Sequence, residues 1–149
     1  MNKIILSFLC LALVGCATVI PDYIEPRYPY ARKVYGDYGA IMACVKRVLA
    51  AEGWAVRKEA DPSTYERGND TKANEDKSVL LFTDVKQHSR FLYSSYTHLN
   101  VFIRPLAGGA EVEMRYACQT PLFVKQLKGA RNDRLVNRLL DAVEHQMEK

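Results

Sequence analysis

The segment from residue 111 to 119 constrains the fold most strongly, because its side chains alternate regularly between two kinds. The apolar positions are Val112, Met114, Tyr116 and Cys118, and the polar positions are Glu111, Glu113, Arg115 and Gln119. Successive side chains of a β-strand point to opposite faces of the sheet. The segment therefore predicts a strand with one apolar face, which needs a covering layer.

Further strands precede this one. Ala107-Gly108-Gly109-Ala110 predicts a hairpin turn, since glycine tolerates the positive φ of tight turns. Before that turn, one strand face carries Leu99, Val101 and Ile103 and the other carries His98, Asn100 and Arg104. Residues 79–85 predict another strand, residues 87–90 a turn, residues 54–57 the start of a strand, and residues 34–35 the end of a short first strand.

Two segments carry the three-to-four-residue spacing of an amphipathic helix. The first runs from a cap at Asp37 to Gly53, and the second from a cap at Asn132 or Asp133 to the C-terminus. The two apolar stripes consist of Ile41, Cys44, Val45 and Val48, and of Leu135, Val136, Leu139, Val143 and Met147. We therefore expect an α+β fold, a two-layer sandwich in which two helices cover one face of an antiparallel sheet of about four strands.

The N-terminus, MNKIILSFLCLALVGCATVIP, has one basic residue followed by an apolar run. The run is shorter than the roughly 20 residues that span a bilayer, and its composition is typical of an export signal. Leu13-Val14-Gly15-Cys16 resembles the lipobox of bacterial lipoproteins. The resemblance implies that the signal, residues 1–15, is removed, that Cys16 receives a diacylglyceryl group, and that its amine is often acylated, for example with palmitate. An ordinary signal peptide with an incidental cysteine is the alternative.

The residues after Cys16 bear on where the chain is held. In Gram-negative lipoproteins an aspartate at the next position tends to retain the protein in the inner membrane, whereas this chain has Ala17. We therefore expect a lipid anchor in the outer membrane, with the domain facing the periplasm. Residues 16–33 comprise the lipidated cysteine and a segment rich in proline and tyrosine, which predicts a stiff spacer that holds the domain off the bilayer.

Residues 34–149 are expected to form a single domain. Within it, residues 61–78 read DPSTYERGNDTKANEDKS and predict a long polar, mobile loop. The order of elements is similar to the helix-grip domain of BamC-like outer-membrane lipoproteins, which are accessories of the β-barrel assembly machinery. The resemblance is architectural and spans residues 34–149. BamC itself has two such domains, whereas this chain has one.

Two cysteines lie beyond Cys16. Cys44 is predicted on the apolar face of the first helix and Cys118 on the apolar face of the last strand. If that helix packs on that face, the two form a candidate disulfide, which an exported compartment permits. Closing a loop of about 74 residues would stabilise the fold by about 4 kcal/mol. Two unpaired buried thiols are the alternative.

The sequence contains no catalytic or metal-binding motif. The histidines, His88, His98 and His145, are predicted in a turn, on a polar strand face and in the last helix, and no HExxH, CxxC or G-x-S-x-G pattern occurs. His98, Asn100 and Arg104 form either a polar patch on an exposed sheet face or ordinary surface. We expect no enzyme activity, cofactor or metal, and the net charge of +4 is too small to predict nucleic-acid binding.

The sequence therefore predicts a non-catalytic, lipid-anchored envelope protein that acts as a protein-binding or accessory factor at the outer membrane. The alternative is a carrier or sensor of a small apolar ligand held between helix and sheet. Aromatic residues that would line such a cavity, or else form the core, are Trp54, Phe91, Tyr96, Phe102 and Tyr116.

Overall fold

The computed structural model describes residues 20–66, 77–89, 91, 94–119 and 130–148. Its elements, in chain order, are β1 (Tyr30–Tyr35), α2 (Tyr38–Ala51), β2 (Val56–Ala60), the 3-10 turn η1 (Pro62–Thr64), β3 (Val79–Thr83), β4 (Lys86–Ser89), β5 (Ser94–Leu106), β6 (Gly109–Gln119) and α3 (Asp133–Met147). Both predicted helices and the hairpin turn predicted at residues 107–110 are confirmed, with β5 ending at Leu106 and β6 beginning at Gly109.

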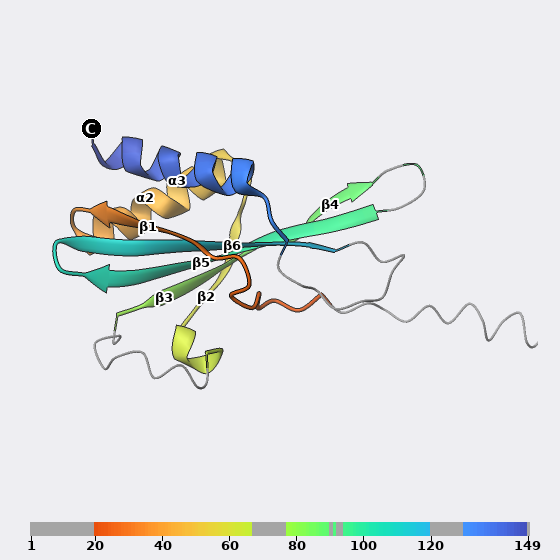
Figure 1. Ribbon diagram of the computed structural model, residues 1–149, viewed down its shortest axis with the longest axis horizontal. Coiled ribbons are helices and arrows are strands. Elements are labelled where there is room, and N and C mark those ends of the chain that lie inside the picture. Colours follow the sequence, from red (N-terminus) through yellow and green to blue (C-terminus); the bar gives the residue numbers. More distant parts are fainter. Residues whose placement is uncertain (1–19, 67–76, 90, 92–93, 120–129, 149) are drawn as a thin grey trace, which may run out of the picture.

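The sheet has six strands, all paired antiparallel, in the order β1-β6-β5-β3-β2, with β4 also pairing with β5 (Figure 1). The prediction of about four strands was too low for two reasons. Strand β1 begins at Tyr30, inside the segment predicted as a spacer, because that segment pairs with β6 as far as Met114. Strand β4 reads KQHS, which carries no apolar alternation and therefore favoured a turn.

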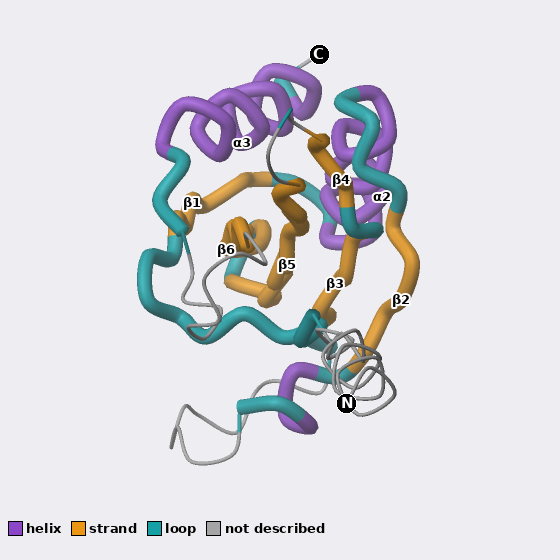
Figure 2. Tube along the Cα trace, turned by 90° about the vertical axis from the view of Figure 1, so that its right-hand side faces the viewer, coloured by secondary structure: helices purple, strands orange, loops and turns teal. Residues whose placement is uncertain are grey.

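Both helices pack on one face of the sheet, as predicted (Figure 2). Asp37 caps α2 by accepting a hydrogen bond from the amide of Ala40 at 2.9 Å, and Asn132 caps α3 through the amide of Leu135 at 3.2 Å. The main core joins the helix stripes to the apolar positions of the central strands. Its fully buried members include Ile41, Val45, Leu49, Val101, Ile103, Val112, Met114, Leu139 and Val143.

The opposite face of the sheet is also covered, which the sequence did not predict. A second core consists of Leu80, Phe82 and Phe102, with Tyr23, Ala60 and Tyr65 packed against it. Residues 20–29, here termed the strap, and η1 lie below the sheet and form a third layer (Figures 1 and 2). The expectation of an exposed polar patch at His98 and Asn100 was therefore wrong, because both side chains are buried beneath the strap.

The predicted polar loop of residues 61–78 is described only at its two ends. Pro62 is buried, and Asp61 accepts a hydrogen bond from the amide of Ser63 at 2.8 Å, which holds η1 in place. Tyr65 stacks on Tyr23 of the strap with ring centroids 5.6 Å apart. The prediction of a mobile loop was therefore wrong for residues 61–66, which are ordered against the strap. Residues 67–76 of the predicted loop lie outside the described residues.

Candidate functional site

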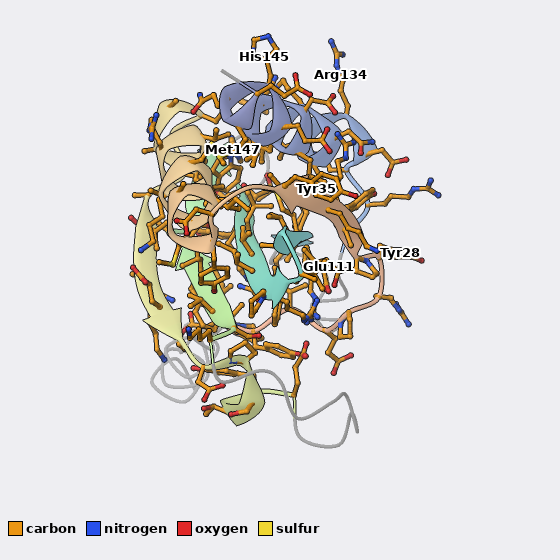
Figure 3. All side chains as sticks on the ribbon, turned by 90° about the vertical axis from the view of Figure 1, so that its left-hand side faces the viewer. Tyr28, Tyr35, Glu111, Arg134, His145 and Met147 are labelled. Atoms are coloured by element: carbon orange, nitrogen blue, oxygen red, sulfur yellow. The ribbon has the colours of Figure 1, made fainter. Side chains whose placement is uncertain are left out.

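Large apolar side chains are exposed at one end of the sheet. This end is formed by the β5–β6 turn and the last residues of β1. Tyr35 is 75% exposed and Leu106 is 42% exposed. They flank a cavity of about 260 Å³ whose other lining residues are Lys33, Val34, Ala107, Gly109 and Ala110. Figure 3 views the molecule from this end, with Tyr35 and Glu111 at the front. We call Tyr35, Leu106 and this cavity the distal patch.

Glycine sets the shape of the distal patch. A Cβ at Gly109 would overlap the carbonyl oxygen of Val34 and lie 2.9 Å from the Cα of Tyr35. Gly108 occupies the turn with φ +78°, a left-handed conformation that side chains rarely adopt. The two glycines therefore let β1 approach the hairpin closely and place Tyr35 beside Leu106.

Charged side chains border the distal patch on the strap side of the sheet. Lys33 of β1 lies opposite Glu111 of β6 in the strand register. The guanidinium of Arg104 contacts Glu111 at 3.4 Å and Glu113 at 2.6 Å. An apolar centre with a charged, partly solvated border is the usual arrangement of a protein–protein contact.

Beneath the strap, these charges continue into a buried ionic cluster made of Arg115, Glu113, Glu66 and Arg104. Arg115 is only 3% exposed; its Nε donates to Glu113 at 2.5 Å and its Nη2 to Glu66 at 2.6 Å. Its guanidinium also lies 3.8 Å from the ring centroid of Phe102. Burial lowers the pKa of Arg115, but the two carboxylates outweigh burial and hold it above its ordinary value.

Asn100 binds the backbone of the strap with both ends of its amide. Its Oδ1 accepts from the amide of Ile24 at 2.7 Å, and its Nδ2 donates to the carbonyl of Asp22 at 3.0 Å. Arg115 adds a bond from Nη1 to the carbonyl of Ile24 at 3.2 Å. The strap is thus attached to β5 and β6 by side chains that satisfy its buried backbone groups.

His98 lies beside Asn100 under the start of the strap and is buried as well. Its ring faces the backbone of Pro21, and its Nε2 has no partner within the described residues. Burial lowers the pKa of His98; Asp22 acts in the opposite direction, and Arg57 lowers it further. Folding therefore favours the neutral imidazole.

This burial predicts a specific loss of stability in acid. Because the pKa of His98 in the folded state lies below the unfolded value of about 6.5, the unfolded chain binds a proton first as the pH falls. The stability contributed by neutral His98 is complete above about pH 6.5 and decreases as the pH falls through the folded-state pKa. Urea unfolding between pH 7.5 and 5 is expected to show a smaller decrease for His98→Gln than for the wild type. Parallel curves for the two proteins would contradict this prediction.

A second, polar cleft of about 630 Å³ lies at the other end of β5. Its lining residues are Gln87, His88, Ser89, Ser95, Thr97, Tyr116 and Cys118. His88 Nε2 lies 3.2 Å from Thr97 Oγ1, and burial raises the pKa of Tyr116. His88 lies in this exposed cleft and contacts Thr97, whereas His98, the next residue of β5, is buried beneath the strap. His145 lies on the exposed side of α3 (Figure 3).

The predicted disulfide is not formed, and both cysteines are free. The Cys44 sulfur faces α3, 3.7 Å from the carbonyl of Val143 and 3.6 Å from Gln146 Oε1. Cys118 lines the polar cleft instead. The prediction was wrong because α2 turns Cys44 toward its neighbouring helix rather than toward the end of β6. Burial raises the pKa of the Cys44 thiol, which disfavours the thiolate.

The structure does not bring the predicted aromatic lining residues together. The Nζ of Lys86 lies 3.8 Å from the ring centroid of Trp54. Phe102 lies on the strap side of the sheet, beneath Arg115. Tyr116 lines the polar cleft, and Phe91 is fully exposed. The core between helices and sheet is mostly aliphatic, but it includes the buried Trp54, and Tyr116 packs against it.

Within the described residues, no group of three or more His, Cys, Asp or Glu side chains is arranged to hold a metal ion. In the same part of the chain, no helix is both long and apolar enough to cross a membrane. The predicted lipidation site, Cys16, lies outside the described residues. Comparisons with protein-family models and with curated proteins found no match to the chain.

The sequence analysis missed the distal patch and the strap contacts. Tyr35 was predicted only as the end of a short strand and Leu106 was not singled out, because their proximity depends on the pairing of β1 with β6. The strap had a weak sequence indication, since His98, Asn100 and Arg115 are polar groups on strands with apolar neighbours. Polar side chains at such positions need partners when they are buried.

Proposed function

We propose that this protein is a lipid-anchored, non-catalytic factor of the cell envelope that binds a protein partner through the distal patch. The exposure of Tyr35 and Leu106 on either side of the 260 Å³ cavity is the observation that carries the proposal. The lipid on Cys16 holds the chain in the outer membrane, and the domain faces the periplasm.

The size of the cavity favours a protein partner. Small-molecule sites usually measure about 300–1,000 Å³. A cavity of 260 Å³ matches a single inserted side chain better, as at the centre of many protein interfaces. The border of Lys33, Glu111 and Arg104 supplies charges that select an orientation of the partner.

The position of the strap predicts that the lipid anchor lies close to the domain. Only four peptide units separate Cys16 from Ile20, and they span at most about 14 Å. The contacts of Pro21, Asp22 and Ile24 with the sheet leave no long spacer between lipid and domain. The domain is therefore held near the bilayer surface rather than off it.

Photo-crosslinking in intact cells tests the proposed partner site. A photoreactive amino acid at position 106 is expected to give a defined crosslinked band, whereas the same group at Arg134, exposed on the outer side of α3, is not. Adding Tyr35→Ala to the position-106 variant is expected to reduce that band severalfold, because tyrosine is among the residue types that contribute most to binding at the centre of an interface.

Thermal unfolding serves as the control for these variants, since both replaced side chains are largely exposed and the melting temperature should change little. No crosslink at position 106, or equal crosslinks at positions 106 and 134, would contradict the distal patch as a partner site.

A further inference from the structure

The hairpin formed by β4 and the start of β5 carries the most exposed aromatic side chain of the described residues. Ser89 pairs with Ser94, so four residues connect the two strands. Phe91, within this connection, is 100% exposed. The hairpin extends past the ends of both helices, on the opposite side of the molecule from the β5–β6 turn (Figure 1).

The hairpin is basic as well as aromatic. Residues 86–97 contain Lys86, His88 and Arg90 and no aspartate or glutamate. Basic residues near a bilayer are attracted to anionic headgroups, and aromatic rings favour the membrane–water interface. An exposed phenylalanine between basic residues therefore fits an anionic lipid surface.

The strap begins nearer to the hairpin than to the β5–β6 turn, because His98, the residue that Pro21 contacts, is four residues from Ser94 and eight from Leu106. Its first contacts are those of Pro21 with His98 and of Asp22 with Asn100, both on β5. His98 is four residues along β5 from Ser94, a distance of about 13 Å. Since Cys16 lies within about 14 Å of Ile20, the anchor and the hairpin are within reach of one bilayer surface.

We infer that Phe91 inserts into the headgroup region of the bilayer in which Cys16 is anchored, with the basic hairpin against anionic lipids. This inference rests on the proposed lipid anchor and adds an orientation to it. The end formed by β4 and the start of β5 faces the membrane. The distal patch, at the other end of the 13-residue strand β5, then lies about 40 Å away from it.

Fluorescence quenching in vesicles tests this orientation. The full-length acylated protein, with Phe91→Trp, is reconstituted into vesicles that contain phosphatidylglycerol and lipids brominated near the headgroup. Trp54 is the chain's one native tryptophan and is buried, so its emission is subtracted with the wild type. Phe91→Trp is expected to lose about half of its emission, as an interfacial ring in contact with the quencher should, whereas Tyr35→Trp should lose almost none.

Flotation of the same vesicles separates the two proposals. If the protein floats but Phe91→Trp and Tyr35→Trp are quenched equally, the membrane-facing hairpin is overturned and the anchor is left intact. Protein that does not float would overturn the anchor and the inference that rests on it. Reduced quenching in purely zwitterionic vesicles is the expected result for a basic hairpin; stronger quenching there would contradict the electrostatic contact.

Discussion

Arg115→Met is expected to lower the free energy of unfolding by about 3–5 kcal/mol, the usual cost of removing one partner from a buried ion pair. The substitution leaves Glu113 and Glu66 under the strap without the guanidinium that both contact. It also removes the Nη1 bonds to the Tyr23 hydroxyl and the Ile24 carbonyl. Methionine retains much of the apolar contact with Phe102, so the loss reports mainly on charge and hydrogen bonds.

Urea unfolding of Arg115→Met measures this effect against an exposed arginine. Arg138 pairs with Glu52 at 2.7 Å, but its side chain is largely exposed, so Arg138→Met is expected to cost less than about 1 kcal/mol. Adding Glu113→Gln and Glu66→Gln to Arg115→Met should recover part of the loss, because the two acids then carry no charge. Similar losses for Arg115→Met and Arg138→Met would show that the buried cluster is not a stabilising unit.

The helices and the central hairpin could be predicted because their information is local. Asp37 and Asn132 cap helices through bonds to amides three residues away, and the apolar stripes repeat within one turn. The alternation of residues 111–119 likewise predicted which side chains of β6 face the helices. Sequence therefore predicted the helix-covered face of the sheet well.

The strap-covered face could not be predicted in the same way, because its contacts join residues far apart in the chain. Tyr23 and Ile24 lie in a proline-rich segment whose composition favours an exposed spacer. Their binding sites are Asn100 and Arg115, separated from them by more than 70 residues. The distal patch depended on the same kind of long-range pairing, between Val34 and Ala110.

Asn100→Leu is expected to release the strap, because leucine keeps the branched outline of asparagine and removes both of its hydrogen bonds. Each buried backbone group left without a partner costs about 1–3 kcal/mol. Hydrogen exchange at the Ile24 amide reports on this opening, and it should accelerate by about 10–100-fold. Unchanged protection of that amide would show that the strap is held elsewhere.

Thr83→Val provides a matched control, because Thr83 also contacts β5 but does not contact the strap. Its hydroxyl accepts from the amide of Leu99 at 2.9 Å and lies 3.2 Å from the Leu99 carbonyl, so valine removes a comparable pair of buried contacts from β5. None of these contacts involves the strap. Thr83→Val is therefore expected to destabilise the domain while leaving exchange at Ile24 slower than in Asn100→Leu.

Release of the strap also changes the distance between lipid and domain. With the strap bound, the tether is the four peptide units from Cys16 to Ile20, whereas a released strap extends it to β1 at Tyr30, a reach of about 50 Å. Asn100→Leu combined with Phe91→Trp should therefore lose quenching by brominated lipids although the protein still floats with the vesicles. Retained quenching would show that the hairpin holds the domain on the bilayer without help from the strap.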